Sequence, residues 1–175
     1  MTNMTSRIFL VGFMGSGKST IGKLLAQALG YRFIDLDTHI ESFKKKTISE
    51  IFSLYGEHGF RKIEQEALKS LSSVQEIVVA SGGGTPCFYD NMEWMKTSGT
   101  VIFLDCSIPS LFERLKSEQA HRPLIKDFAP PALEQFISKK LAERRPFYAQ
   151  ASIQVFEMKD KSATVQWILD ALQTI

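Results

Sequence analysis

The sequence predicts an α/β fold in which a parallel sheet is covered by helices on both faces. Two observations lead to this prediction. Short apolar runs alternate along the chain with segments whose apolar residues recur at helical spacing. Several of these runs are apolar throughout, which is typical of strands buried on both faces of a parallel sheet. The strands that we expect are residues 8–11, 32–37, 77–80, 101–104 and 153–156.

The first of these strands leads into a glycine-rich loop. Residues 12–20, Gly-Phe-Met-Gly-Ser-Gly-Lys-Ser-Thr, match the G-x-x-x-x-G-K-[ST] pattern, and they lie between a strand and a helix as that pattern requires. Glycines let backbone N–H groups surround a phosphate, and the helix N-terminus adds a partial positive charge. We expect Lys18 to neutralise phosphate oxygens and Ser19 to ligate Mg²⁺. A nucleoside triphosphate would be bound by Gly15, Ser16, Gly17, Lys18, Ser19 and Thr20.

The other elements follow from caps and breaks. Gly30 is a natural residue to end the first helix. Residues 47–50, Thr-Ile-Ser-Glu, form a capping box that begins a short helix, and the glycines from 56 to 59 predict a break. Later helices are expected over about 60–71, from near Pro109, over 133–148 and at the C-terminus. Right-handed crossovers bring the carboxyl ends of all strands to one edge of the sheet, where we expect a ligand crevice.

Two carboxylates end the second expected strand. Asp35 and Asp37 are two residues apart, so in a strand both side chains would face the crevice. One could hold Mg²⁺ while the other orients or deprotonates a hydroxyl nucleophile. The alternative is that Asp37 caps a helix beginning at Thr38, and the two roles are compatible.

Gly82, Gly83 and Gly84 follow the third strand and could bring bare backbone N–H groups close to a ligand. The alternative is a tight turn, for which one glycine would suffice. Arg61 lies in the expected first turn of a helix, where a cation is unfavourable. It therefore needs an anion, either a carboxylate ligand or Glu64, and a surface ion pair is the simpler alternative.

Further arginines lie late in the chain. Residues 117–131 combine charge and proline without a helical period, which favours a lid that orders over bound substrate. Arg122, within that segment, is a candidate to close on the transferring phosphate. Arg144 and Arg145 lie near the end of a helix; one could bind a carboxylate in a fork, and the other is expected to be a solvated charge.

Size and charge limit the class of protein. The chain has 175 residues, the size of one domain with a proper core, so we expect a single domain over 1–175. A net charge of +2 is too small to indicate nucleic-acid binding. No apolar run approaches the length of a membrane span, and the N-terminus lacks the pattern of a signal peptide. We expect a cytoplasmic monomer with a small-molecule substrate and with Cys87 and Cys106 as free thiols.

Taken together, these motifs resemble the shikimate kinase family over nearly the whole chain. The matching segments, in order, are G-F-M-G-S-G-K-S-T at 12–20, F-I-D-L-D at 33–37, I-S-E-I-F at 48–52, G-E-x-G-F-R-x-x-E at 56–64, S-G-G-G at 81–84, R-P-L at 122–124 and R-x-P-x-Y at 144–148. Many nucleotide enzymes share the phosphate-binding loop, so the acidic, arginine and glycine motifs make the resemblance selective.

The resemblance implies a P-loop kinase fold of the nucleoside-monophosphate-kinase-like class, with a five-stranded parallel sheet of order 2-3-1-4-5. It also implies an acceptor-binding helical segment over about 38–64 and a lid over about 117–131. The implied reaction, a step of aromatic amino-acid biosynthesis, transfers the γ-phosphate of ATP to the 3-hydroxyl of shikimate and gives shikimate 3-phosphate and ADP.

Residue roles carry over by position. Asp37 would orient the 3-hydroxyl, Arg61 and Arg144 would bind the carboxylate, and Gly82, Gly83 and Gly84 would line the acceptor site. Lys18 and Arg122 would hold the transferring phosphate, with Ser19 and Asp35 on the Mg²⁺ side. The chain departs from the family at the adenine: Leu115 stands where an arginine is usual, with Arg114 adjacent, and residues 156–161 lack the usual pattern.

Other classes with the same loop fit less well. A signalling GTPase needs an N-K-x-D motif, which the sequence lacks. A gluconate-type or nucleoside-monophosphate kinase shares the fold but does not explain Asp37, Arg61 and the glycine run together. A nucleotide-gated interaction module would be expected to lose Lys18, Asp37 or Arg122, and the chain has all three.

Overall fold

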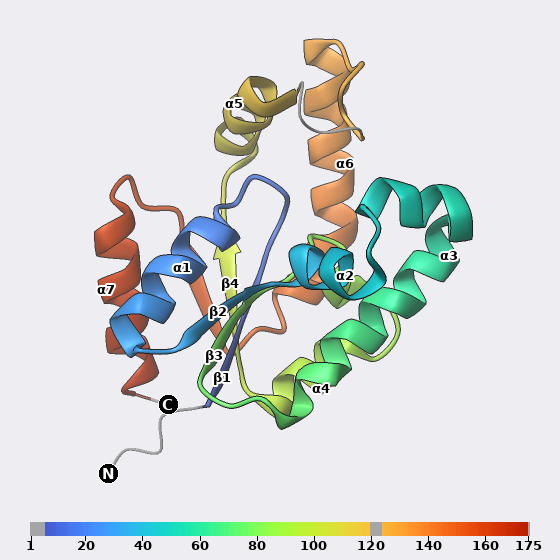
Figure 1. The fold of residues 1–175 in the computed structure, drawn as a ribbon. Coiled ribbons are helices and arrows are strands. Elements are labelled where there is room, and N and C mark those ends of the chain that lie inside the picture. Colours follow the sequence, from blue (N-terminus) through green and yellow to red (C-terminus); the bar gives the residue numbers. More distant parts are fainter. Residues whose placement is uncertain (1–5, 120–123, 175) are drawn as a thin grey trace.

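The computed structural model describes residues 6–119 and 124–174, and it contains one five-stranded parallel sheet (Figure 1). The order of the strands is β2-β3-β1-β4-β5, which confirms the expected order 2-3-1-4-5. In the central strand, Phe9 lies opposite Val79 of one neighbour and Val101 of the other. The strands are β1 (Arg7–Val11), β2 (Arg32–Asp35), β3 (Ile77–Ala80), β4 (Thr100–Asp105) and β5 (Ile153–Phe156).

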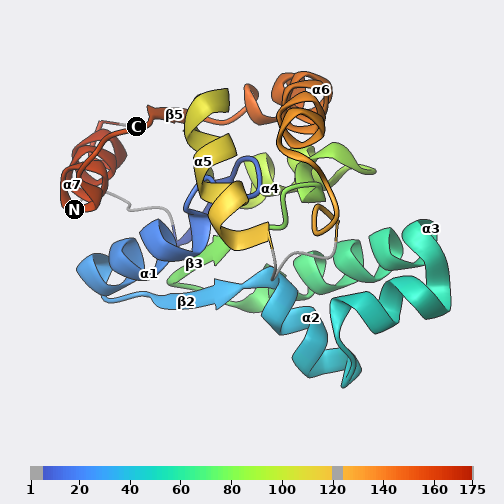
Figure 2. The same cartoon turned by 90° about the horizontal axis from the view of Figure 1, so that it is seen from above.

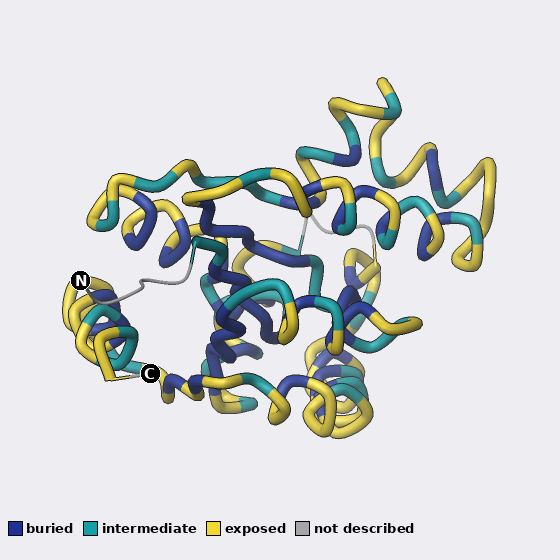
Figure 3. Tube along the Cα trace, turned by 90° about the horizontal axis from the view of Figure 1, so that it is seen from below, coloured by how far each residue is buried: buried dark blue, intermediate teal, exposed yellow. Residues whose placement is uncertain are grey.

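Helices cover both faces of the sheet and enclose two cores (Figure 2). Alternation along β1 divides it between them, with Ile8 and Leu10 in one core and Phe9 and Val11 in the other. The first core is covered by α1 (Lys18–Leu29) and α7 (Lys161–Leu172). The second is covered by α2 (Leu36–Lys44), α3 (Ile48–Lys69), α4 (Asn91–Ser98), α5 (Ile108–Glu118) and α6 (Pro130–Tyr148). Figure 3 shows the buried strands between helices whose outer faces are exposed.

The second strand ends two residues earlier than expected. β2 stops at Asp35, whose carboxylate accepts a hydrogen bond from the Thr38 amide at 3.3 Å and so caps α2. Asp37 is therefore in the first turn of a helix, and the prediction that the two aspartates share one face of a strand is wrong. The expected helix cap exists, but Asp35 provides it rather than Asp37.

The break predicted between residues 56 and 59 is a kink at one residue. The capping box of Thr47 and Glu50 begins α3 as expected. Gly56 then has φ 65° and ψ −176°, a conformation that favours glycine, and the helix resumes directly after it. Gly59 is helical, and a Cβ there would lie 2.4 Å from the Cβ of Tyr55. Gly30 ends α1 with φ 71°, as expected, whereas α4 and two short 3₁₀ turns at Ser70–Ser73 and Thr85–Cys87 were not expected.

The segment expected to be a lid is partly helical, since Ser117 and Glu118 belong to α5 and Pro130 and Pro131 to α6. The amide of Gln119 donates to the carbonyls of Ile125 at 2.7 Å and Phe128 at 2.6 Å, which ties the two ends of the segment together. Arg122 and His121 lie outside the described residues. In the described part of the chain, no helix has both the length and the apolar character needed to cross a bilayer.

Candidate active site

The carboxyl ends of all five strands surround one cavity of about 580 Å³, a size within the range of small-molecule sites. This is the edge of the sheet at which ligands bind in parallel α/β folds. Each strand leads residues into the lining. The glycine-rich loop follows β1, Asp35 ends β2 with Asp37 two residues beyond, and Gly82 and Gly83 follow β3. Asp105 ends β4, and Phe156 ends β5 with Glu157 directly after it.

The glycine-rich loop ends in an open helix N-terminus. Gly15 and Gly17 have φ values of 79° and 90°, which residues with a side chain rarely adopt. Gly17 is the N-cap of α1 without a side-chain hydrogen bond, and the first turn of the helix has no acidic residue. The N–H groups of this turn are therefore suited to an anion. Residues 15–20, which were expected to bind the phosphates, all line the cavity.

Lys18 is held at the base of this loop. Its ammonium group donates to the carbonyl oxygens of Gly12 at 2.8 Å and Phe13 at 2.9 Å, and its side chain is buried. The same positive charge lowers the pKa of Asp37, so the two groups are close enough to interact electrostatically. Lys18 therefore links the phosphate loop electrostatically to the carboxylate that lies just after β2.

Two oxygen ligands suited to Mg²⁺ lie side by side. The hydroxyl of Ser19 donates to Asp35 Oδ2 at 2.7 Å, and both residues line the cavity. Among the described residues, no group of three or more His, Cys, Asp and Glu side chains could hold a metal on its own. Mg²⁺ commonly takes only one or two protein ligands in addition to nucleotide phosphates and water, so the pair fits this ion.

Asp37 has an environment that favours its protonated form. Loss of hydration raises its pKa from 3.8 to about 6, with further increases from the negative charges of Asp35 and Glu64. The residue still faces the open cavity, and a Cβ on Gly82 would lie 3.3 Å from its Oδ1. A carboxyl group with a pKa in this range is suited to accept a proton near neutral pH.

The three glycines after β3 make room for the protein's own side chains. None has a positive φ, so the alternative of a tight turn that requires glycine is wrong. Each would instead clash with a different group if it carried a Cβ. The closest atoms are Glu64 Oε1 and Thr85 Oγ1 at 2.9 Å from Gly82, Met14 N at 3.3 Å and Arg144 Nη1 at 3.4 Å from Gly83, and Arg61 Nη2 at 2.7 Å from Gly84.

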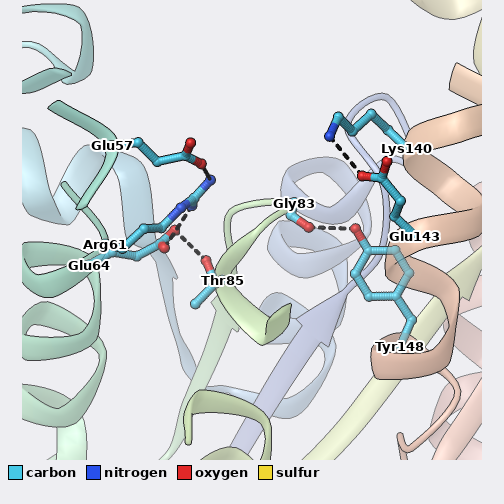
Figure 4. Close-up of polar contacts among 8 residues, drawn as sticks. All are labelled: Glu57, Arg61, Glu64, Gly83, Thr85, Lys140, Glu143 and Tyr148. Carbon is cyan, nitrogen blue, oxygen red and sulfur yellow. Dashed lines mark hydrogen bonds and ion pairs between the residues drawn. The ribbon is translucent and has the colours of Figure 1, made fainter. Parts of the chain in front are cut away.

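Arg61 is buried, with 8% of its surface exposed, so the surface ion pair considered above is wrong. Its Nη1 donates to Glu64 Oε2 at 2.9 Å, and Thr85 donates to the other oxygen of Glu64 at 2.6 Å (Figure 4). The guanidinium lies over the Phe88 ring at 4.1 Å. Its Nε is buried without a hydrogen-bond partner, and the exposed Glu57 is 3.4 Å from Nη2. Glu64 therefore pairs with only one of the guanidinium nitrogens, Nη1.

The two late arginines differ in their partners. Arg145 is exposed to solvent as expected, but it also forms an ion pair with Asp105, a buried carboxylate that accepts a further hydrogen bond from Gln154 at 2.8 Å. Arg144 is half-buried, lies over the Phe13 ring at 5.7 Å and approaches Gly83. Burial raises the pKa of Cys87 to about 11, and the charges of both Arg144 and Arg61 act against this increase. The two guanidinium groups therefore converge near Cys87.

Arg114 also lines the cavity, although the sequence predicted no role for it. Its Nη1 donates to the Gly15 carbonyl at 3.0 Å, and its Nη2 forms an ion pair with Glu157. Leu115 is fully buried instead, and a Cβ on Gly15 would lie 3.2 Å from its Cδ2. The signal in the sequence was the arginine next to the position at which the family usually has one.

The structure does not bring every predicted residue to the cavity wall. Arg61, Gly84 and Arg144 are absent from its lining and lie around the glycine turn beside it. The position of Arg122 falls within 120–123, which are not described.

A phosphate loop that shares its cavity with an aspartate of raised pKa, next to two arginines at the adjoining glycine turn, defines a P-loop kinase for a small anionic acceptor. The family model "Shikimate kinase" matches residues 14–173. The chain therefore belongs to the shikimate kinase family, whose members use ATP.

Individual relatives agree with this family. The chain is 49% identical over 154 residues to a shikimate kinase of Azobacteroides pseudotrichonymphae genomovar. CFP2, covering 87% of this chain and 91% of that one. The crystal structure of shikimate kinase from Bacteroides thetaiotaomicron has a TM-score of 0.92 at 40% identity, and the match covers 97% of this chain and 99% of that one. The Acinetobacter baumannii shikimate kinase in complex with shikimate has a TM-score of 0.88 at 34% identity, and the match covers 97% of this chain and 93% of that one.

The first prediction concerns Asp37. Without nucleotide, its carboxyl should titrate with a midpoint near pH 6 in carboxyl-detected NMR. Between pH 3.8 and about 6 the folded state keeps a proton on Asp37 that the unfolded chain has released. The free energy of unfolding should therefore fall as the pH rises through this range. Asp35→Asn should lower the midpoint more than Glu41→Gln, because Asp35 raises the pKa more. A wild-type midpoint near 3.8 would contradict the assignment.

The second prediction concerns Gly84, whose φ of −95° accommodates alanine. Gly84→Ala should therefore act through the clash with Arg61 and lower the free energy of unfolding by about 1–3 kcal/mol in urea denaturation. In an Arg61→Ala background the same substitution should cost less than about 0.5 kcal/mol. Equal costs in both backgrounds would show that the clash is not the cause.

Proposed function

We propose that this chain transfers the γ-phosphate of ATP to the 3-hydroxyl of shikimate, giving shikimate 3-phosphate and ADP in aromatic amino-acid biosynthesis. One observation carries the proposal at the level of residues. The phosphate loop and Asp37 share one cavity, while two cations that suit a carboxylate lie around the glycine turn beside it. A small polyol with one carboxylate matches both features.

On the nucleotide side, Gly15, Ser16, Gly17, Lys18, Ser19 and Thr20 hold the phosphates. Lys18 is the fixed cation at the transferring phosphate, since its ammonium already points into the loop. Ser19 and Asp35 would hold Mg²⁺, which would supply positive charge to offset that of the phosphates. We assign Arg122 to the same phosphate by its place in the family motif, in a lid over about 117–131.

Asp37 orients the 3-hydroxyl of the acceptor and accepts its proton as the bond to phosphorus forms. Its pKa of about 6 lets it ionise at neutral pH while it remains basic enough to attract that proton. The positive charge of Lys18 favours the ionised form, so binding of a nucleotide that engages Lys18 would also change the basicity of Asp37.

Arg61 and Arg144 bind the shikimate carboxylate at the glycine turn formed by Gly82, Gly83 and Gly84. Arg61 is suited to this because Glu64 occupies only its Nη1, while the carboxylate near Nη2 is the exposed Glu57 at 3.4 Å. A ligand carboxylate would replace Glu57 at Nη2 and accept a charge-assisted hydrogen bond there. The helical segment of about 38–64 would then form the acceptor side of a single domain over 1–175.

The proposal includes the setting of the enzyme. We infer a cytoplasmic monomer that acts on a small molecule, without a nucleic-acid or membrane partner. A coupled ADP-release assay with shikimate, gluconate and nucleoside monophosphates tests the function directly. Turnover should be specific for shikimate; faster turnover of gluconate or a nucleotide would reject the proposal.

The third prediction is that Asp37→Asn lowers kcat roughly 10²- to 10⁴-fold, the usual effect of losing a group that accepts the acceptor proton. ATP affinity, measured by calorimetry, should stay within a few-fold of wild type. The matched control is Asp170→Asn, which changes an exposed aspartate on α7 and should leave kcat unchanged. Equal losses of kcat and ATP affinity in Asp37→Asn would point to a structural role.

The fourth prediction is that Arg61→Ala and Arg144→Ala each raise the KM for shikimate roughly 10- to 100-fold, because each removes a charge-assisted hydrogen bond. The exposed Arg32→Ala is the control. An acceptor analogue without the carboxylate should bind wild type poorly and lose little more in either variant. If the variants weaken the analogue as much as shikimate, the carboxylate assignment is wrong.

A further inference from the structure

We propose that the hydroxyl of Tyr148 is a positioning group for the acceptor, which fixes the carbonyl of Gly83 and thereby holds the glycine turn and Arg144 in the geometry that binds shikimate. This inference rests on the proposed function, because it concerns the acceptor end of the same site.

The contacts of Tyr148 separate its ring from its hydroxyl. The side chain is fully buried, and its ring packs against Phe103 with a centroid distance of 5.2 Å. The hydroxyl donates to the carbonyl oxygen of Gly83 at 2.5 Å (Figure 4). A phenyl ring would fill the same space in the core, so packing alone does not require the hydroxyl. Burial raises the pKa of Tyr148, which keeps the hydroxyl protonated and able to donate.

Gly83 is the point at which the two halves of the site meet. A Cβ there would lie 3.3 Å from the amide nitrogen of Met14 in the phosphate loop and 3.4 Å from Nη1 of Arg144. Glycines have no side chains to hold them in place, so the turn depends on bonds made by its backbone. A displacement of Gly83 by a few tenths of an ångström would be transmitted to both neighbours.

The bond also orients the next peptide group. No described peptide bond is cis, so the N–H of Gly84 points opposite to the carbonyl of Gly83. With that carbonyl directed at Tyr148, the N–H of Gly84 points away from α6. Figure 4 shows Arg61 on the side of the turn opposite Tyr148. The hydroxyl therefore sets the direction of a donor at the turn that Arg61 contacts.

Helix geometry places Tyr148 beside Arg144. The two residues are four apart on α6 and so lie on the same face of the helix. The charge of Arg144 acts to lower the pKa of Tyr148, against the larger effect of burial, and the weaker effect of Arg61 agrees with its place across the turn. The hydroxyl is thus beside one group assigned to the acceptor carboxylate and across the turn from the other.

The test is Tyr148→Phe, which keeps the ring and removes the donor. The KM for shikimate should rise about ten-fold, the scale of losing a hydrogen bond to a buried carbonyl. The KM for ATP should stay within two-fold. Ile137→Val, a buried aliphatic change on the same helix, is the control for lost packing: it should lower the melting temperature and leave both KM values unchanged.

Double variants give a second readout. Because Tyr148 acts on the turn against which Arg144 lies, Tyr148→Phe should raise the shikimate KM less in an Arg144→Ala background than in wild type. An unchanged shikimate KM in Tyr148→Phe, a parallel rise of both KM values, or full additivity with Arg144→Ala would each overturn the inference. Wild-type turnover with shikimate is measured first, so failure of the proposed function is recognised separately.

Discussion

Close packing around the glycine turn after β3 is the constraint on which the acceptor half of the site depends. The volumes that three side chains would have occupied are filled by Glu64 and Thr85, by Arg144, and by the guanidinium of Arg61. Because protein interiors are packed as densely as crystals, these groups cannot move inward or outward independently. The turn lies between the loop that follows β1 and the helix that follows β2, so its shape also sets the distance between phosphate and acceptor groups.

Burying so many polar groups is tolerated because they are connected. Glu64 uses both oxygens, one for Arg61 and one for Thr85, and the carbonyl of Thr85 accepts from the buried Asn91 at 2.9 Å. A buried charge with a well-placed partner avoids the large penalty of an isolated one, whereas removal of either partner exposes that penalty. The network therefore links α3 and α4 to the glycine turn of the proposed acceptor site, although of these two helices only α3 supplies a residue assigned to the ligand.

The sequence was sufficient for the phosphate loop, which depends on a local pattern, and the family resemblance supplied the strand order. The sequence was misleading at the end of the second strand, where Asp35 could either continue the strand or cap a helix. In the structure its carboxylate accepts a hydrogen bond from the Thr38 amide, and the strand ends there. Long-range partners could not be predicted either. Arg144 and Arg145 are adjacent, and only the position of Asp105, 40 residues earlier, determines which is anchored. The need for three glycines likewise became clear only from the side chains that approach them.

The hydrogen bonds of Lys18 have a consequence for nucleotide affinity. Its ammonium is already directed into the loop by the carbonyls of Gly12 and Phe13, so the conformational entropy of a long side chain is lost during folding rather than on binding. Entropy that is already lost in folding is not lost again when a phosphate binds, which favours nucleotide affinity. The order that these two carbonyl groups impose on Lys18 therefore serves both folding and nucleotide binding.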